Sequence, residues 1–224
     1  MNATAKINSI HEQIIIVGAH MAKAGLVTAT LGNISARLAD TTDRFVITPS
    51  GIPYQEITKQ DLVVINGDGS IDPGQRKPST ELLLHKAVYE VCAHAGAIVH
   101  SHSIYASAFA VARQSIPAIL EDQVQLVGGE IPTTQYAPAG SLAFVEAAAQ
   151  TLLQSKGQAV LLANHGLIGI GDTVDQAYQV CQLVEKTAQI YIMSTLIGKP
   201  NMIPEENIIT LKESYFNNYG QRRE

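Results

Sequence analysis

The chain has 224 residues, of which 46% are hydrophobic, and a formal net charge of -5 at pH 7. This length suits one large domain with a sizeable core, so we expect residues 1–224 to form a single domain. The negative charge and the lack of a long Lys/Arg cluster disfavour a nucleic-acid or membrane-surface partner. The sequence has no apolar run of about eighteen residues and no signal-peptide pattern, so we expect a cytoplasmic protein.

The first third of the chain predicts one helix followed by strands. Residues 7–24 place apolar side chains at helical spacing, and Gly25 ends the predicted helix. The pattern then changes to that of a hairpin, with strands at 33–38 and 44–48 joined by a polar turn. A short strand is predicted at 62–65, before a turn rich in Asn, Asp and Gly.

The rest of the chain predicts helices that alternate with two apolar strands. The helices are expected at residues 79–94, 103–113, 141–154 and 174–197, and the strands at residues 98–102 and 159–163. This alternation implies a layered α/β domain, and the hairpin and uneven spacing argue against a regular doubly wound sheet. Cys92 and Cys181 lie in helical patterns without a C-x-x-C motif, so we expect them to be core thiols.

Two histidines, His100 and His102, end the first of these apolar strands. Because strand side chains alternate between faces, both imidazoles are expected on the same side. Two imidazoles on one face suit a divalent metal ion, and a third would make a catalytic site with an open position. The second apolar strand is likewise followed by a histidine, His165, and a tight turn. The pattern favours a three-histidine metal site over structural or solvated histidines.

Three short segments predict an anion-binding site. Gly32-Asn33 permits close approach of the backbone to a ligand, and residues 48–51, TPSG, form a turn with hydroxyls and exposed amides. Residues 77–81, KPSTE, open a helix that Ser79 or Thr80 can cap, with free N–H groups in its first turn. Each segment alone fits an ordinary turn or helix cap. Together they predict loops that converge on one phosphate group.

Glu81 is the carboxylate that stands out, because substrate and a nearby metal ion could both reach the first turn of this helix. The alternative is a favourable helix-dipole charge. His85 lies four residues later on the same helical face, so a Glu81–His85 metal pair stays open as a less favoured alternative. His11, His20 and His94 stand singly and are expected to be surface or packing residues.

Five segments, in this order and at this spacing, resemble the class II aldolase/adducin family. They are GNISAR at 32–37, TPSG at 48–51, KPSTE at 77–81, HSH at 100–102 and NHG at 164–166. The resemblance covers nearly the whole chain. It implies a three-layer α/β/α sandwich with a central, mostly antiparallel sheet, and a cyclic homotetramer with active sites between neighbouring subunits.

The resemblance also implies roles for individual residues. It implies a Zn²⁺ ion, with Mn²⁺ or Co²⁺ as alternatives, held by His100, His102 and His165, with Glu81 as a further ligand and the catalytic acid/base. The phosphate contacts of the family fall on six residues of the anion segments. These are Gly32, Asn33, Ser50, Gly51, Ser79 and Thr80.

The activity implied by the resemblance is cleavage of a ketose 1-phosphate, such as L-fuculose 1-phosphate, to dihydroxyacetone phosphate and a small aldehyde. The metal ion would act as a Lewis acid for the enediolate that forms when the C3–C4 bond breaks. Glu81 would move the proton at the carbon that becomes the hydroxymethyl group. Sugar-phosphate 4-epimerases of the family have aspartate at this position, so glutamate favours aldol cleavage.

Two positions depart from the pattern of the family's aldolases. Glu121 stands about where an aldolase has a tyrosine, and Gln125 aligns with a catalytic aspartate of the 4-epimerase. Glu121 and Asp122 are either a carboxylate pair at a helix N-terminus or groups that serve other chemistry. Epimerase, dehydratase and decarboxylase activities therefore stay open. A non-catalytic interaction module like adducin is a further alternative, against which the metal ligands of this chain argue, because adducin lacks them.

The C-terminal segment 208–224 is predicted to be a mobile tail. Tyr215, Phe216 and Tyr219 lie there among polar residues, in a segment too short to build its own core. These aromatic residues either anchor the tail on the subunit or belong to a flap that closes over the site. We predict the flap, with Tyr219 as a second catalytic residue near the leaving aldehyde oxygen.

Overall fold

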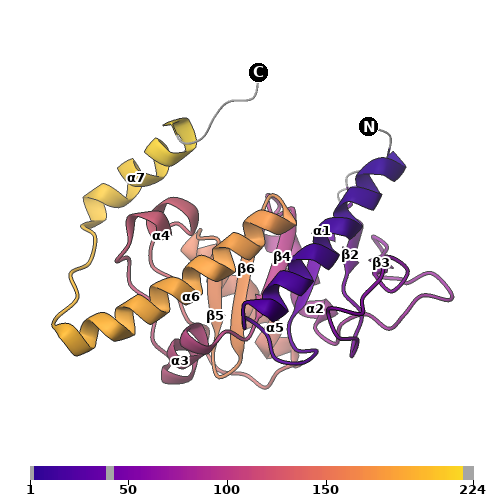
Figure 1. Ribbon diagram of the computed structural model, residues 1–224, viewed down its shortest axis with the longest axis horizontal. Helices are drawn as coiled ribbons and strands as arrows, with labels where there is room; N and C mark the ends of the chain where they lie inside the picture. Colours follow the sequence, from indigo (N-terminus) through magenta and orange to yellow (C-terminus); the bar gives the residue numbers. More distant parts are fainter. Residues whose placement is uncertain (1–2, 39–42, 219–224) are drawn as a thin grey trace.

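A computed structural model describes residues 3–38 and 43–218, in which helices pack on a single six-stranded sheet (Figure 1). The strands are β1 (Asn33–Arg37), β2 (Phe45–Ile47), β3 (Val63–Ile65), β4 (Ala97–Ser101), β5 (Ala159–Leu162) and β6 (Gly166–Gly171). Their order is β3-β2-β1-β4-β6-β5, and every neighbouring pair is antiparallel. The predicted α/β class with an antiparallel sheet is confirmed.

Seven helices occur in the part of the chain that the structure describes. They are α1 (Ala3–Lys23), α2 (Leu82–Val91), α3 (Ile104–Ala112), α4 (Glu121–Leu126), α5 (Leu142–Ser155), α6 (Val174–Ile197) and α7 (Glu205–Asn218). The sequence did not predict β6 or α7, and a helix that begins near Glu121 was one of two alternatives. None of the described helices has the length and apolar character needed to cross a membrane.

Side-chain alternation along the strands divides the core between two faces of the sheet. Val99 of β4 packs in the same cluster as Val184 of α6, whereas its neighbour Ile98 packs in the same cluster as Leu152 of α5. Full burial of each such side chain stabilises the folded protein by roughly 1.5–3 kcal/mol relative to leaving it exposed to water. Cys92 and Cys181 are free and buried, as predicted for core thiols.

Helix α2 begins at Leu82, three residues later than predicted, with Glu81 as its N-cap residue. The reason lies in the segment before it, where Pro78 forms an isolated β-bridge with Pro49 and the Ser79 N–H donates to the Thr48 carbonyl oxygen at 3.0 Å. These contacts keep residues 78 and 79 extended. The Ser79 hydroxyl accepts from the Glu81 N–H at 3.2 Å, so it forms a turn before the helix rather than the predicted cap.

The C-terminal segment is helical through residue 218 and is fixed to α4, with which α7 is in contact. The Ile203 N–H donates to the Ala118 carbonyl oxygen at 2.8 Å just before α7 begins. Tyr215 is partly buried and lines a cavity of about 290 Å³ together with Gly171 and Asp172. Residues 208–218 of the predicted tail are thus helical and belong to an element that contacts α4, and the mobility of the tail stays a prediction.

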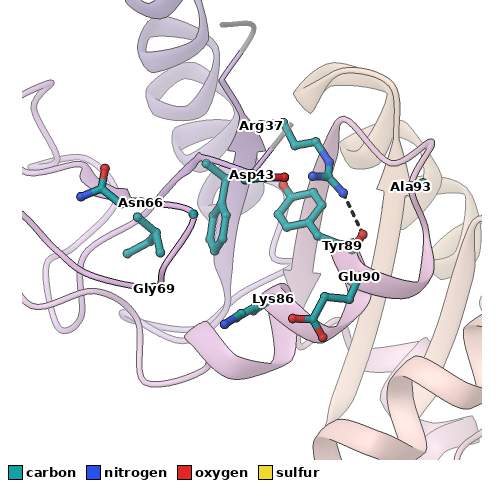
Figure 2. Close-up of a pocket in the computed structure, with 11 residues that line it drawn as sticks. Arg37, Asp43, Asn66, Gly69, Lys86, Tyr89, Glu90 and Ala93 are labelled. Carbon is teal, nitrogen blue, oxygen red and sulfur yellow. Dashed lines mark hydrogen bonds between the residues drawn. The ribbon is translucent and has the colours of Figure 1, made fainter. Parts of the chain in front are cut away.

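A cavity of about 360 Å³ lies between α2 and the end of the sheet formed by β1, β2 and β3 (Figure 2). Tyr89 forms part of its wall and is clamped by aromatic and cationic neighbours. The Arg37 guanidinium carbon lies 4.5 Å from the Tyr89 ring centroid, and the Phe45 ring centroid lies 5.1 Å from it. Arg37 also donates to the Tyr89 carbonyl oxygen at 2.7 Å. Tyr89 is thus held in one orientation at this end of the sheet.

Candidate active site

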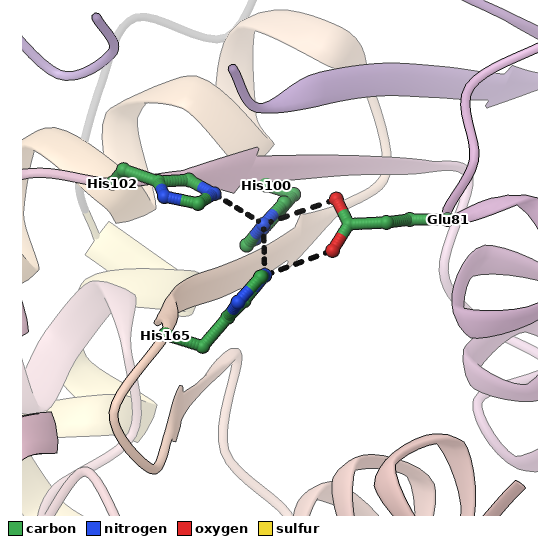
Figure 3. Close-up of side chains that lie close together, drawn as sticks. All are labelled: Glu81, His100, His102 and His165. Carbon is green, nitrogen blue, oxygen red and sulfur yellow. Dashed lines mark hydrogen bonds and ion pairs between the residues drawn. The ribbon is translucent and has the colours of Figure 1, made fainter. Parts of the chain in front are cut away.

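Four side chains from separate parts of the chain meet at the end of β4 (Figure 3). His100 belongs to β4 and His102 follows it directly, whereas His165 lies in the turn between β5 and β6. Because β4 pairs with β6 so that Ser101 lies opposite Leu167, the turn brings His165 beside β4. Glu81 approaches from the N-cap position of α2.

The local sequence allows these elements to come close. Asn164 adopts a left-handed φ of 56°, which turns the chain before His165. Gly166 follows, and a Cβ atom there would lie 2.4 Å from the Ser101 carbonyl oxygen and 3.2 Å from the His100 Cε1 atom. Any larger residue would therefore push β6 away from β4.

The ligand atoms of the four side chains lie within 4.8 Å of one another. His100 Nε2 lies 2.9 Å from His102 Nε2 and 3.2 Å from His165 Nε2. The Glu81 carboxylate oxygens lie 3.2 Å from His100 Nε2 and 2.8 Å from His165 Nε2. Two nitrogen ligands of a tetrahedral zinc ion, each at about 2.1 Å from the metal, lie about 3.4 Å apart. The donor set fits a divalent metal ion.

The protonation of the histidines also suits a metal ion. The His100 Nδ1–H donates to the Leu167 carbonyl oxygen at 2.9 Å, which leaves the Nε2 lone pair directed at the cluster. Burial lowers the pKa of His100, and burial together with the neighbouring His100 and His165 lowers the pKa of His102 to about 4. Both rings are therefore neutral at pH 7, which is the form that binds metal ions.

Glu81 remains ionised in this environment. Burial alone would raise the pKa of its carboxyl, but the interaction with His100 and the hydrogen bonds from His165 and Asn33 hold the pKa below its usual range. The Asn33 Nδ2–H donates to Glu81 Oε2 at 2.7 Å. Glu81 can therefore serve as a metal ligand or accept a proton.

A cavity of about 390 Å³ opens beside this cluster, and all six residues that the sequence predicts for an anion site line it. Glu81, His102 and His165 line the same cavity. The six are Gly32, Asn33, Ser50, Gly51, Ser79 and Thr80. The predicted anion and metal sites are thus neighbours in one space.

Backbone hydrogen bonds connect the anion segments and change which groups are available. The Ser50 N–H donates to the Lys77 carbonyl oxygen at 3.0 Å, and the Leu82 N–H donates to the Ser79 carbonyl oxygen at 3.1 Å. These two amides are therefore occupied rather than exposed. Ser50, Gly51 and Ser79 line the cavity, and the two serine hydroxyls and the Gly51 amide are the groups left for an anion.

His85 does not belong to the metal cluster, so the alternative Glu81–His85 metal pair is wrong. Its Nε2 atom lies 2.5 Å from Asn33 Oδ1, and its Nδ1 atom lies 2.6 Å from Ser35 Oγ. The sequence analysis missed Ser35 and Tyr89, which complete this buried network. The spacing of Glu81 and His85 on one helical face was a signal that His85 points inward.

Glu121 and Asp122 occupy the first turn of α4. This agrees with the alternative that they form a carboxylate pair at a helix N-terminus. Asp122 Oδ2 pairs with Lys186 Nζ at 2.5 Å on the surface. Neither Glu121 nor Asp122 is among the described residues that line the cavity beside Glu81. Tyr219, predicted to be catalytic, lies outside the described residues.

Comparisons with known proteins identify the family of the chain. Residues 12–192 match the family model of the class II aldolase and adducin N-terminal domain. The chain is 35% identical to 5-deoxy-D-ribulose 1-phosphate aldolase of Bacillus thuringiensis serovar kurstaki over 94% of this chain and 97% of that protein. It is 34% identical to L-fuculose phosphate aldolase of Escherichia coli strain K12 over 97% of this chain and 98% of that protein.

A solved structure of L-fuculose 1-phosphate aldolase has the same fold, with a TM-score of 0.86 and 29% identity over 93% of this chain and 96% of that one. The matched segment includes all four side chains of the cluster. The chain belongs to the class II aldolase and adducin family.

Proposed function

We propose that the protein is a metal-dependent aldolase that cleaves a ketose 1-phosphate to dihydroxyacetone phosphate and a small aldehyde. The observation that carries this proposal is the position of the Glu81 carboxylate. It lies close to two histidines of the cluster and lines a cavity that the anion segments also line. Both relatives described above are named as aldolases of sugar phosphates.

Each part of the site has a role in this reaction. Ser50, Gly51 and Ser79 would bind the phosphate group and so fix the distance between phosphate and reacting carbons. His100, His102 and His165 would hold a divalent ion, which supplies Lewis-acid stabilisation of the negative charge that develops on the ketose oxygens. Cleavage breaks the C3–C4 bond and leaves its electron pair on C3.

Glu81 then completes the reaction as the proton carrier. Because its carboxyl has a lowered pKa, it starts as a carboxylate with two oxygens among the histidines. It would receive a proton from the substrate or from water and deliver it to C3, which becomes the hydroxymethyl carbon of dihydroxyacetone phosphate. In the synthetic direction it removes the same proton.

Replacement of this carboxylate tests the proposal. Glu81→Gln should leave a folded protein in which cleavage and deuterium exchange into dihydroxyacetone phosphate both fall roughly a hundredfold to ten-thousandfold. Glu90→Gln, an exposed carboxylate at the other end of α2, is the matched control and should keep normal rates. Near-normal exchange in Glu81→Gln would remove Glu81 from this role.

A panel of phosphorylated ketoses would separate the reaction from related chemistry on the same scaffold. Release of dihydroxyacetone phosphate should be the dominant product signal, with assays for epimerisation, dehydration and decarboxylation run in parallel. Products of one of these other reactions without dihydroxyacetone phosphate would contradict the proposal.

The proposal extends to the setting of the enzyme. We propose zinc as the ion, the cytoplasm as the location, a three-layer α/β/α arrangement and a homotetramer with sites between subunits. Large apolar side chains exposed near the end of α6 support an assembly, because Leu196 is 84% exposed and Ile197 is 89% exposed. Tyr219 is proposed as a catalytic residue of the tail.

A further inference from the structure

A series of buried side chains connects Glu81 to the interior of the subunit. Asn33 Nδ2 lies 2.7 Å from Glu81 Oε2, and Asn33 Oδ1 lies 2.5 Å from His85 Nε2. On the other side of the ring, His85 Nδ1 lies 2.6 Å from Ser35 Oγ, which lies 2.9 Å from the Tyr89 hydroxyl oxygen. His85 and Ser35 are fully buried, with 0% exposure.

The chemistry of each group determines the direction of every hydrogen bond. An ionised carboxylate only accepts, so Asn33 directs its Nδ2–H at Glu81 and its Oδ1 at His85. An amide oxygen only accepts, so His85 carries its proton on Nε2. Burial lowers the pKa of His85 to about 3, so the ring is neutral and its Nδ1 accepts from the Ser35 hydroxyl. Burial raises the pKa of Tyr89, which therefore keeps its proton and donates to Ser35.

We propose that this series of donors holds the Glu81 carboxylate in its working orientation, and that His85, in the Nε2–H tautomer, is its central positioning residue. The inference rests on the proposed function, in which Glu81 carries the proton, and assigns new roles to His85 and Ser35. Groups of this kind around metal ligands commonly fix ring or carboxylate orientation.

The direction of the bonds makes the arrangement cooperative. If His85 carried its proton on Nδ1, its Nε2 lone pair would face the Asn33 oxygen, and the Asn33 amide would have to rotate. The rotated amide would present its oxygen to Glu81 and repel the carboxylate. The far end is held as well, because the Arg37 guanidinium lies over the Tyr89 ring in the cavity of about 360 Å³ (Figure 2). The Phe45 ring packs against the same tyrosine.

The tautomer of His85 is the first test, and it needs no catalytic activity. Nitrogen-15 NMR of the histidine-labelled protein at neutral pH, with His85 assigned by the loss of its signals in His85→Gln, should show a protonated Nε2 and an unprotonated Nδ1. A proton on Nδ1, or a mixture of tautomers, would overturn the proposal. This result stands even if the aldolase proposal fails.

A pair of substitutions is the second test. His85→Leu removes the donor to Asn33, whereas the amide of His85→Gln can still donate to it. His85→Leu should weaken zinc binding and lower kcat by roughly 10–100-fold with little change in KM, and His85→Gln should restore most of both. Lys86→Gln is the control. It changes the next residue of α2, which lines the cavity of about 360 Å³, and should leave zinc affinity and kcat as in the unsubstituted protein.

Equal losses in both His85 variants, or a change confined to KM, would show that His85 only fills space. If His85→Leu does not fold, Ser35→Ala takes its place, because it removes the donor to His85 Nδ1 and deletes a single oxygen atom. Ser35→Ala should reduce zinc affinity and kcat in the same direction. Unchanged values in Ser35→Ala would overturn the proposal, and zinc affinity decides the matter without an aldolase assay.

Discussion

At the scale of residues, three imidazoles and one carboxylate direct their ligand atoms at a common point. His100 provides the clearest case, because its Nδ1–H is committed to the Leu167 carbonyl oxygen and its Nε2 lone pair has only other ligand groups in front of it. A cation relieves the repulsion between such lone pairs. Metal binding should therefore stabilise the folded protein as well as enable its chemistry.

The first prediction concerns metal content. The unsubstituted protein should bind about one divalent ion per chain, and His100→Ala and His165→Ala should both lose it because each removes one converging ligand. Elemental analysis of the purified variants measures this. His94→Ala, an exposed histidine outside the cluster, serves as the control and should keep its metal. Normal metal content in both ligand variants would refute the site.

The second prediction concerns pH and His85. Its pKa is lowered to about 3 in the folded protein, chiefly by burial, from about 6.5 in an unfolded chain. Between these values the unfolded chain binds a proton that the folded protein does not. Neutral His85 therefore makes its full contribution to the free energy of unfolding above about pH 6.5. Below that pH the contribution falls by about 1.4 kcal/mol per pH unit.

Urea unfolding of the metal-free protein between about pH 7 and pH 5 measures this slope. The free energy of unfolding of His85→Gln should fall less steeply, because glutamine does not titrate and the other histidines are common to both proteins. Identical slopes would mean that His85 is not buried in its neutral form.

At the scale of elements, the cavity depends on how three segments are connected. The Thr48 N–H donates to the Ile34 carbonyl oxygen, and the Ser79 N–H donates to the Thr48 carbonyl oxygen, both at 3.0 Å. These bonds attach the segments to β1 in a fixed order. Residues of these segments thus line one cavity, which Glu81 also lines.

The third prediction follows from that arrangement. Phosphorylated ketoses should greatly exceed the corresponding free sugars in kcat/KM, because remote binding of the phosphate supports the chemical step. Ser79→Ala should narrow this ratio by removing one hydroxyl from the cavity wall. Ser214→Ala, an exposed serine of α7, is the control and should leave the ratio unchanged. Equal efficiency on both kinds of sugar would contradict a phosphate site.

The elements with strong hydrophobic periodicity were predicted well, and the others were not. The range 174–197 predicted for a helix is the range of α6, because its apolar stripe and its Thr173 cap are local features. Strand β6, GLIGIG, was missed because its three glycines weaken any strand pattern. Those glycines have a tertiary reason, since a Cβ at Gly169 would lie 2.7 Å from the Cys181 sulfur in α6.

At the scale of the whole molecule, the C-terminal helix lies far from the metal ligands of its own chain. Tyr215 lines a cavity with Gly171, which pairs with the first residue of β4, Ala97. His100 and His102 lie at the other end of β4. We therefore propose that Tyr219 serves the site of a neighbouring subunit in the proposed homotetramer.

The fourth prediction tests this arrangement. Deletion of residues 219–224 should leave thermal stability and metal content nearly unchanged, because α7 remains packed on α4, while turnover falls strongly. Tyr219→Phe should reproduce much of the loss. Mixed assemblies of Glu81→Gln and Tyr219→Phe subunits should recover activity, since some sites would contain both native residues. Full turnover in Tyr219→Phe, or a joint loss of stability and turnover on truncation, would contradict the prediction.

The sequence by itself singled out the four residues that the structure brings together, the segments that line one cavity, and the elements whose signals are local. His100 and His102 share a face because strand geometry has a period of two, and this needs no knowledge of distant residues. Only the tertiary structure decided how these pieces meet. It excluded His85 from the metal cluster and placed it behind Asn33, because the direction of a buried side chain depends on partners 50 and 52 residues away in the chain. It also showed that α7 is a helix in contact with α4. A weakly amphipathic segment forms a helix through the surface on which it packs, and that surface cannot be read from the segment itself.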